Sequence, residues 1–319
     1  MIARPALIPD TFRVGLLLTE QCNIACRHCW FNCSPEKTSN MKLDEAYSCI
    51  DQAIEIPTVE WISFTGGEPF LLYGMMKTLI EYASSKGLKT ECVTNCFWAE
   101  SEEGAENILK RLVKSGLDVI NISVDDFHQE HIPFTRVKNC YQASKALGLK
   151  IVIMSASART NKLRLEKITD LLGRDEILTR QQKGLKSYSA IAIETCFLPV
   201  GRGADIPESE LLVGSEPTGG PCKSVLRDVA VTPSGEVLPC CSVAGLLDIM
   251  RLGNILNMKL KDALEEASRR KLFRILSDEG PEGLLKLLSD NASRGYVSRC
   301  HMCYEVLREA SSSNFYSTF

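Results

Sequence analysis

Three cysteines near the start of the chain are the residues best suited to chemistry. Cys22, Cys26 and Cys29 stand at i, i+4 and i+7, directly after the apolar run 14–18. Thiolates hold iron–sulfur clusters, and a four-iron cluster has four irons to ligate. Three cysteines would leave one iron without a protein ligand, and an open position on a metal centre is where chemistry occurs. Zinc, or three unrelated core cysteines, is the alternative, because free cysteine is among the most buried residue types.

A second motif, Gly66-Gly67-Glu68-Pro69, directly follows the short apolar run 61–65. Paired glycines allow a backbone to approach a ligand closely and to present unpaired backbone groups to it. The same four residues would also serve a simple turn between a strand and a helix. With the cysteines upstream, we interpret the segment as a ligand-binding turn.

A second group of cysteines lies in the C-terminal third of the chain: Cys222, Cys240, Cys241, Cys300 and Cys303. An apolar strand from Asp228, a Pro-Ser-Gly turn and a second strand lead into the Cys240-Cys241 pair, which predicts a β-hairpin. Five thiols suit one four-iron cluster with one thiol left over, and they are too few for two fully ligated clusters. A structural zinc site is the alternative, since zinc also takes four cysteines.

The side chains of Cys240 and Cys241 are expected to point in opposite directions, because adjacent residues of an extended strand face opposite sides. If Cys240 binds the metal, Cys241 should face away from it. A reduced thiol in that position is able to donate a hydrogen atom to a radical. The alternative is that Cys241 is a small buried apolar residue.

The elements that must position these residues alternate between strands and helices. Strands are predicted over 13–19, 61–65, 90–94, 119–124, 150–156 and 190–198, and helices over 43–55, 73–86, 103–115, 136–147 and 163–172. This alternation predicts a parallel α/β sheet. The alternation stops near residue 205, where a stretch rich in Glu, Ser, Gly and Pro predicts a domain boundary. Two amphipathic helices are expected beyond it, over 258–274 and 282–290.

The composition is that of an ordinary soluble globular protein, with 319 residues, 45% hydrophobic residues, 24% charged residues and a net charge of −3. It shows no basic footprint for nucleic acid, no apolar run of membrane-helix length and no signal peptide. We therefore expect a cytoplasmic protein that binds neither nucleic acid nor membrane. The scattered cysteines are expected to be small core residues, with Cys33 and Cys96 nearest the first motif: Cys33, Cys49, Cys92, Cys96, Cys140 and Cys196.

The C-x3-C-x2-C spacing and the Gly-Gly-Glu-Pro segment resemble the radical S-adenosylmethionine (SAM) superfamily. The resemblance implies a partial (β/α)6 TIM-like barrel over residues 1–205, in which Cys22, Cys26 and Cys29 hold a [4Fe–4S] cluster. SAM would occupy the open iron, and an electron from the cluster would cleave it to a 5′-deoxyadenosyl radical. A flavodoxin or a ferredoxin is the electron donor that we expect.

The same resemblance assigns the residues that would bind SAM. The segment 66–69 would hydrogen-bond the amino group of SAM, and His28 would stack near the adenine. Val200 and Gly201, after the last strand, resemble the family's adenine contact. In such barrels chemistry gathers at the C-terminal ends of the strands. The strand-end residues that we expect to contact the ribose and carboxylate of SAM are Asn95, Ser123, Asp125 and Ser155.

The C-terminal hairpin resembles the SPASM/Twitch domains, in which cysteines bind auxiliary clusters. For residues 206–319 the resemblance implies a small domain with one auxiliary [4Fe–4S] cluster. Its ligands would be Cys222, Cys240, Cys300 and Cys303. Cys241 would then be the remaining thiol, turned toward the mouth of the barrel.

A closer resemblance, to the radical SAM peptide epimerases, extends over most of the chain. It rests on segments 29–35, 62–70, 93–98, 272–288 and 300–303, together with Asp228 and the Cys240-Cys241 pair. It implies that Cys241 quenches a substrate radical and that Asp228 assists it. The expected activity is epimerisation of L-residues to D-residues in a ribosomal peptide, with the peptide as partner.

Three other functions fit parts of the same sequence. The auxiliary cluster would accept an electron, instead of supplying one, in a dehydrogenase or a peptide cross-linking enzyme. A sugar or aminoglycoside epimerase would use the same fold on a small molecule. A non-enzymatic iron–sulfur or zinc protein would need only the cysteines.

Overall fold

The computed structural model describes residues 10–179, 187–288 and 295–312, which form two compact units. The first unit contains residues 1–16, 41–60 and 212–319, and the second contains residues 17–40 and 61–211. Strand β1 (Arg13–Thr19) begins in the first unit and ends in the second. The domain boundary predicted near residue 205 stays a prediction.

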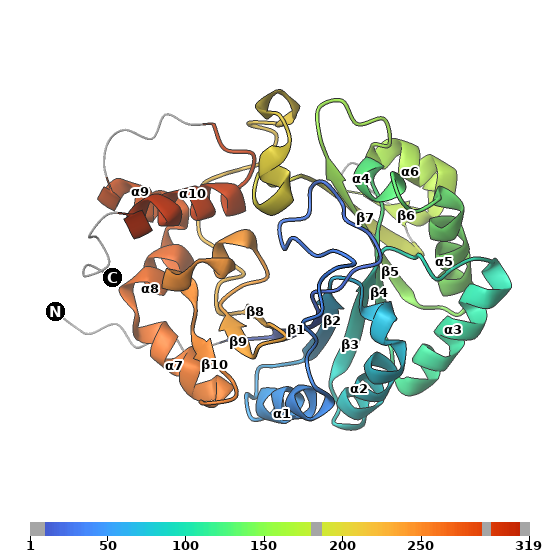
Figure 1. Cartoon of the computed structure of the whole chain (residues 1–319), viewed down its shortest axis with the longest axis horizontal. Helices are drawn as coiled ribbons and strands as arrows, with labels where there is room; N and C mark the ends of the chain where they lie inside the picture. The colour runs from blue at the N-terminus through green and yellow to red at the C-terminus, as the bar shows by residue number, and fades with distance from the viewer. Residues whose placement is uncertain (1–9, 180–186, 289–294, 313–319) are drawn as a thin grey trace. The chain divides into compact units, whose positions relative to one another are not determined.

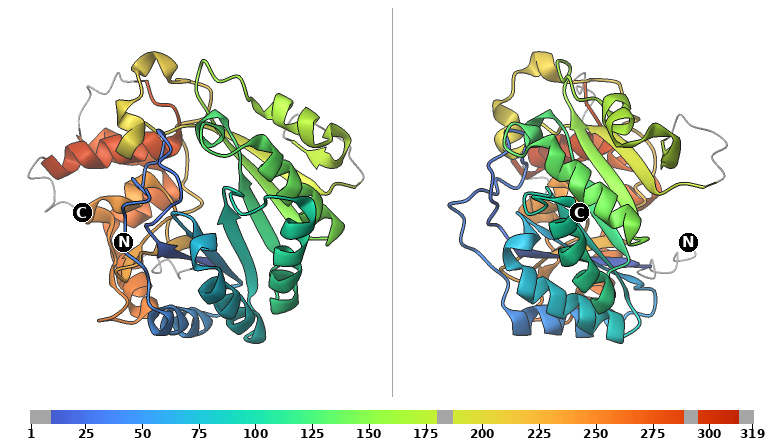
Figure 2. Two further views of the ribbon diagram at one scale, coloured as in Figure 1. Left: turned by 45° about the vertical axis from the view of Figure 1, so that its right-hand side comes forward. Right: turned by 90° about the vertical axis from the view of Figure 1, so that its right-hand side faces the viewer.

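The second unit is built on parallel strands with helices outside them. Its strands are β2 (Trp61–Gly66), β3 (Lys89–Thr94), β4 (Val119–Ser123), β5 (Lys150–Ser157), β7 (Ala190–Cys196) and, at the edge, the short β6 (Ile177–Leu178). Each strand is parallel to its neighbour in this order. Helices α2 (Tyr73–Ser85), α3 (Glu102–Ser115), α5 (Phe134–Ala146) and α6 (Leu165–Leu172) lie along the outer side of these strands (Figure 1, Figure 2).

Helix α3 shows why these residues form these elements. The hydroxyl of Ser101 accepts a hydrogen bond from the backbone N–H of Gly104 and caps the first turn. Ala105, Leu109 and Leu112 recur at helical spacing and are fully buried. Gly116 ends the helix in the left-handed conformation, with φ of 106°. Local signals and the apolar stripe therefore agree on the same helix.

The first unit is a small sheet with helices packed around it. Strand β8 (Asp228–Val231) is parallel to β1 and antiparallel to β9 (Glu236–Leu238), which pairs with β10 (Gly253–Asn254). The helices are α1 (Leu43–Ile54), α7 (Leu260–Arg269), α8 (Lys271–Asp278), α9 (Pro281–Leu288) and α10 (Arg299–Ser312). The predicted hairpin is therefore present as β8 and β9.

The sequence interpretation was wrong at two places in this unit. The single helix expected over 258–274 is two helices, α7 and α8, because Arg270 between them adopts extended backbone angles. Helix α10 was not predicted, although it carries two of the proposed ligands. In the second unit, the one-turn helix α4 (Asp126–Gln129) and strand β6 were also missed.

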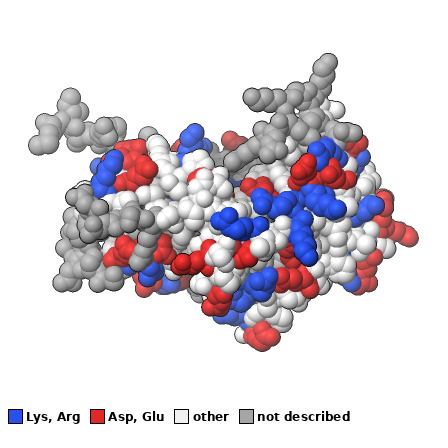
Figure 3. Space-filling view, turned by 90° about the horizontal axis from the view of Figure 1, so that it is seen from above, with Lys and Arg blue, Asp and Glu red and all other residues white. Residues whose placement is uncertain are grey.

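Positive and negative side chains are interspersed over the face of the described residues seen in Figure 3. Among the described helices, none combines the length and the apolar character that a bilayer crossing needs. All six scattered cysteines are buried, as the sequence predicted.

Candidate functional site

The loop after β1 brings the first three cysteines into one apolar cluster of the second unit. Cys22 and Cys26 are buried and Cys29 is half-buried, packed with Ile24 and Ile132. The loop closes on itself because the backbone N–H of Cys22 donates to the carbonyl of Ser34 at 3.1 Å. The structure therefore places three thiols in a pocket that water enters poorly.

Burial governs the chemistry of these thiols. It raises the pKa of Cys22 to about 11 and raises that of Cys26 as well. A hydrogen bond from the Cys33 thiol lowers the pKa of Cys29 to about 6. Iron ligation requires thiolates, so the metal must replace the protons that burial favours on Cys22 and Cys26.

The glycines of the second motif are required by the protein backbone itself. Gly66 has φ of 136°, and a Cβ added to it would lie 2.3 Å from the carbonyl oxygen of Thr19. A Cβ on Gly67 would lie 2.0 Å from the carbonyl oxygen of Gln21. The N–H groups of Gly67 and Glu68 donate to these two carbonyls, at 2.7 and 2.9 Å. The turn therefore packs directly on the backbone that leads into Cys22, a reason for glycine that the sequence interpretation had not identified.

Glu68 joins this turn to the end of β3. Its buried carboxylate accepts hydrogen bonds from the backbone N–H groups of Asn95 (2.8 Å) and Phe70 (3.2 Å) and from the hydroxyl of Thr94 (3.0 Å). Burial raises the pKa of Glu68 to about 7 despite these donors. The Asn95 side chain in turn donates to Asn23 of the cysteine loop at 2.8 Å. Glu68 thus connects the predicted SAM-binding segments to one another.

A second polar group surrounds His28. The His28 ring stacks on Phe127, with centroids 4.5 Å apart, and meets His128 edge-on at 5.0 Å. Burial lowers the pKa of His28 to about 4, so its imidazole is neutral. Its Nδ1 has no hydrogen-bond partner within the described part of the chain. The ring of His28 thus stacks on a protein side chain, and its predicted place near the adenine stays a prediction.

Asp125 is held as a carboxylate by its neighbours. Burial alone would raise the pKa of Asp125, but the charge of His128 and its hydrogen bond lower it. The Asp125 carboxylate caps α4 by accepting from the N–H of His128, and it also accepts from the N–H of Ala156 at 3.0 Å. The side chains of His28, Asp125 and His128 approach within 4.8 Å of one another, as in a metal site. Burial alone would lower the pKa of His128, but the charge of Asp125 and its hydrogen bond raise it.

The other predicted SAM contacts differ in their surroundings. Ser155 is buried, and its hydroxyl has no hydrogen-bond partner among the described residues. Ser123 is half-buried at the end of β4. Val200 is buried, and Gly201, with φ of 60°, lies against the cysteine loop: an added Cβ would be 2.6 Å from the carbonyl oxygen of Trp30. Gly201 therefore contacts the loop of Cys29 whatever else it binds.

The C-terminal cysteines gather in the first unit. Helix α10 packs against the segment Val243–Leu246, which closely follows Cys240 in the chain. Burial, and with it the charges of Cys303, Cys300 and Cys222, raises the pKa of the Cys240 thiol. Helix α10 presents Cys300 and Cys303 three residues apart, on one face. The N–H of Cys222 donates to the carbonyl of Leu276 at 2.9 Å, which ties this cysteine to α8. The structure brings together the four residues proposed as auxiliary ligands.

Cys241 lies beside Asp228, apart from these four. Its sulfur is 3.4 Å from Asp228 Oδ1, and its backbone N–H donates to the Asp228 carbonyl at 3.0 Å. Arg13 binds the same carboxylate with two hydrogen bonds, of 2.7 and 2.5 Å, a contact that the sequence interpretation missed. A Cβ added to Gly15 would be 3.5 Å from the sulfur.

The Cys241 side chain is accessible to water, yet protein surrounds the sulfur closely. Burial and the charge of Asp228 together raise the pKa of the thiol. Cys241 is therefore held in the S–H form, with its hydrogen pointing toward a carboxylate.

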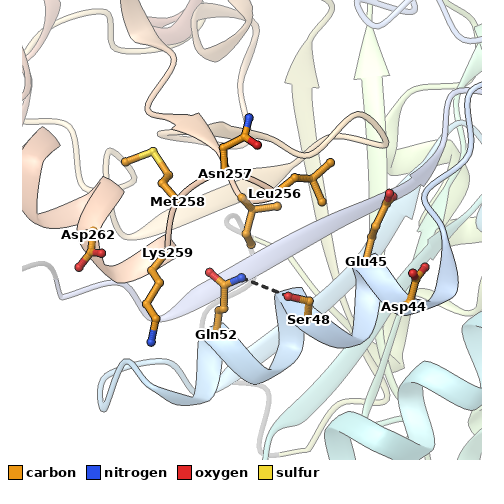
Figure 4. Close-up of a pocket in the computed structure, with 10 residues that line it drawn as sticks. Asp44, Glu45, Ser48, Gln52, Leu256, Asn257, Met258, Lys259 and Asp262 are labelled. Atoms are coloured by element: carbon orange, nitrogen blue, oxygen red, sulfur yellow. Dashed lines mark hydrogen bonds between the residues drawn. The ribbon is translucent and has the colours of Figure 1, made fainter.

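A groove in the first unit is lined by none of the cysteines of either group. It has a volume of about 660 Å³ and lies between α1 and the segment 255–262 (Figure 4). Gln52 and Ser48 of α1 hydrogen-bond to each other at 3.2 Å on its floor. None of the predicted site residues lines it, so it takes no part in the chemistry inferred below.

Comparison with known proteins identifies the family. The sequence matches the Radical SAM superfamily over residues 16–155 and the SPASM iron–sulfur cluster-binding domain over residues 222–304. The chain is a radical SAM protein with a SPASM domain. Its fold class is accordingly the partial (β/α)6 TIM-like barrel with a small C-terminal auxiliary domain, and its cofactors are a SAM-binding [4Fe–4S] cluster, auxiliary iron–sulfur and SAM.

Several known proteins are similar to this chain over most of its length. YydG of Bacillus subtilis (strain 168), which is named for peptide biosynthesis, is 24% identical over 310 residues, 95% of this chain and 94% of YydG. The PqqA peptide cyclase of Methylocella silvestris is 25% identical over 308 residues, 82% of this chain and 76% of the cyclase. The structure of Streptococcus suis SuiB bound to precursor peptide SuiA has the same fold, with a TM-score of 0.59 at 14% identity, over 91% of this chain and 76% of SuiB.

The residues present fit the cofactors of this family. Three thiols converge in the first cluster, which matches a [4Fe–4S] cluster with one open iron. Two buried polar atoms of the second unit, His28 Nδ1 and Ser155 Oγ, have no partner among the described residues and suit a polar ligand such as SAM. The four C-terminal thiols match a second cluster.

We expect Glu68→Gln to weaken the region that binds SAM. The amide would place an N–H against a backbone N–H that now donates to the carboxylate, at a cost of about 1–3 kcal/mol. Chemical unfolding should show lower stability, and addition of SAM should change the electron paramagnetic resonance (EPR) spectrum of the reduced cluster less than in the unchanged protein. The control is Glu106→Gln on the exposed face of α3. Equal SAM response in both variants would remove Glu68 from this role.

We expect Cys303→Ala to remove the auxiliary cluster alone. Iron per chain should fall by the content of one [4Fe–4S] cluster, while reductive cleavage of SAM continues at the other cluster. The matched control is Cys49→Ala, at a buried cysteine of α1 outside both groups. The site would instead be structural zinc if Cys303→Ala kept the same iron content as the unchanged protein but lost one zinc per chain.

Proposed function

We propose that this protein is a radical SAM peptide epimerase, in which Cys241 donates the hydrogen atom that completes inversion. The observation that carries the proposal is that the two adjacent cysteines at the end of the hairpin have different surroundings. The charges of Cys222, Cys300 and Cys303 act on the buried Cys240, whereas the sulfur of Cys241 lies 3.4 Å from Asp228 Oδ1. The enzyme therefore has a thiol that the auxiliary cluster does not need.

When bound, the first cluster and SAM would supply a 5′-deoxyadenosyl radical that removes a hydrogen atom from a peptide Cα. The auxiliary cluster would supply the electron that later restores the Cys241 thiol. The second motif, Glu68 and the His28 group orient SAM against the first cluster. Cys241 gives its hydrogen atom to the opposite face of the substrate Cα radical, so that a C–H bond forms as the S–H bond breaks. One electron and one proton then restore the Cys241 thiol.

Asp228 is placed to handle the proton of this cycle. Its Oδ1 accepts from the Cys241 thiol, and after hydrogen-atom transfer the same oxygen is the base nearest the sulfur. Arg13 holds the carboxylate through two hydrogen bonds, which fixes the orientation of Oδ1. A thiol, unlike a thiolate, has a hydrogen atom to give, so the raised pKa of Cys241 serves the reaction.

A ribosomal peptide is the substrate that the relatives favour. SuiB binds a precursor peptide, the PqqA cyclase is named for a peptide, and YydG is named for peptide biosynthesis. We further propose reduced flavodoxin or ferredoxin as electron donor and the cytoplasm as location, because oxygen-sensitive clusters and free thiols suit a reducing compartment.

Peptide cross-linking or dehydrogenation is the second candidate. The name of the PqqA cyclase relative favours it, because cyclisation of a peptide forms a new bond and needs no returned hydrogen. Both functions begin with the same hydrogen abstraction. They differ in whether a solvent-exchangeable thiol returns a hydrogen to the product.

We expect Cys241→Ala to abolish the inverted product while SAM cleavage continues. The assay would use the short peptide encoded beside the gene, with reductant, in D2O. The unchanged enzyme should place one solvent deuterium on the inverted Cα, since the thiol proton exchanges with water. Cys49→Ala is the control and should behave as the unchanged enzyme.

Two results would contradict the proposal. One is normal formation of the D-residue by Cys241→Ala. The other is a product that has lost two hydrogens and carries no deuterium at Cα, which is the result expected of the cross-linking or dehydrogenation alternative.

A further inference from the structure

Arg202 makes contacts with the cysteine loop that the proposed chemistry does not use. Its Nε donates to the carbonyl of Cys26 at 2.9 Å, and its Nη2 donates to the carbonyl of Cys33 at 2.6 Å. Its backbone N–H donates to the carbonyl of Cys29 at 3.2 Å. A single residue therefore binds the loop at three points, two of which are backbone groups of proposed iron ligands.

The residues beside Arg202 are small because this contact is close. A Cβ on Gly201 would lie 2.6 Å from the carbonyl oxygen of Trp30, and one on Gly203 would lie 2.2 Å from that of Leu198. Gly201 also needs φ of 60°, which side chains other than glycine rarely adopt. Gly201 is thus fitted to the backbone of the cysteine loop, and Gly203 is fitted to the backbone of Leu198, which precedes this segment.

Arg202 is half-buried, and its guanidinium stays protonated in proteins. Its guanidinium donates to the backbone on both sides of Cys29, at Cys26 and at Cys33, so its positive charge lies along the loop that carries the three thiols. Among cationic side chains, only arginine offers a planar fork that binds two separate carbonyls at once. Both properties, the fork and the charge, bear on a cluster held by these thiolates.

We propose that Arg202 is a positioning residue for the SAM-binding cluster. Its two side-chain hydrogen bonds fix the path of the loop from Cys26 to Cys33, and therefore the spacing of the ligands. Its positive charge lies beside a cluster that is already negative and gains one more negative charge on reduction. The charge of Arg202 therefore stabilises the reduced form and raises the reduction potential of the cluster. The result is a cluster that binds firmly and is easier to reduce.

The experiment compares Arg202→Gln and Arg202→Lys with the unchanged full-length protein, each loaded with iron and sulfide under anaerobic conditions. Two quantities are measured without any substrate: the rate of iron loss to a chelator, and the reduction potential of the cluster by EPR-monitored titration. The signal of the SAM-binding cluster is recognised by its change on addition of SAM. Arg159→Gln is the control, since Arg159 also donates to two backbone carbonyls, those of Ser209 and Leu211, away from the cysteine loop.

Arg202→Gln should lose iron several-fold faster and titrate at a lower potential. Arg202→Lys should lose iron faster but keep a potential near that of the unchanged protein, because it keeps the charge and loses the fork. Arg159→Gln should match the unchanged protein in both. If circular dichroism shows that Arg202→Gln folds but it holds no cluster at the first site, the positioning role is upheld. The reduction potential of Arg202→Lys, compared with that of the unchanged protein, then decides whether the positive charge acts on the cluster.

Unchanged iron retention and potential in Arg202→Gln would overturn the proposal. So would an equally low potential in Arg202→Lys and Arg202→Gln, since the charge would then have no effect. The proposal would also be overturned if Arg159→Gln lost iron as fast as Arg202→Gln. The loss of any arginine contact with a loop backbone would then be enough to speed iron loss.

Discussion

The site depends on close backbone packing around one loop. On one side, Gly66 and Gly67 pack against the carbonyls of Thr19 and Gln21, where a Cβ would come within 2.3 Å or less. On the other side, Arg202 donates to the carbonyl of Cys26, and Gly201 packs against the carbonyls of Cys29 and Trp30. The two buried thiols, Cys22 and Cys26, prefer to keep their protons, so a metal cluster must compensate for that preference. A loop that moved freely could not hold the thiols in the spacing that a cluster requires.

The C-terminal site applies the same constraint with different elements. Hairpin β8–β9 delivers Cys240 into a group of thiols completed by α10, and the residue that follows, Cys241, lies beside Asp228. The pairing of β1 with β8 places Arg13 opposite Asp228 in register, so sheet geometry sets the contact between guanidinium and carboxylate. Under the proposed function, ligation and hydrogen-atom donation would fall to neighbouring residues of one chain segment.

Much of this arrangement could be predicted from the sequence. The strands could be found because their apolar runs are short and bounded by turn residues, and the first ligands because three thiols at fixed spacing have few other uses. Helix α10 escaped because polar residues and cysteines interrupt its apolar pattern. The break at Arg270 carries neither glycine nor proline, so nothing local marks it. Arg13 and Arg202 bind partners more than a hundred and fifty positions away in the chain, and a single sequence gives no sign of such pairs.

The most direct test of this account is the hyperfine spectrum of the reduced protein with SAM labelled isotopically at its amino nitrogen and carboxylate oxygens. The account predicts magnetic coupling from both labels to one [4Fe–4S] cluster, and its loss when Cys26 is replaced by alanine. A cluster spectrum that SAM leaves unchanged, or coupling that survives the loss of Cys26, would contradict it.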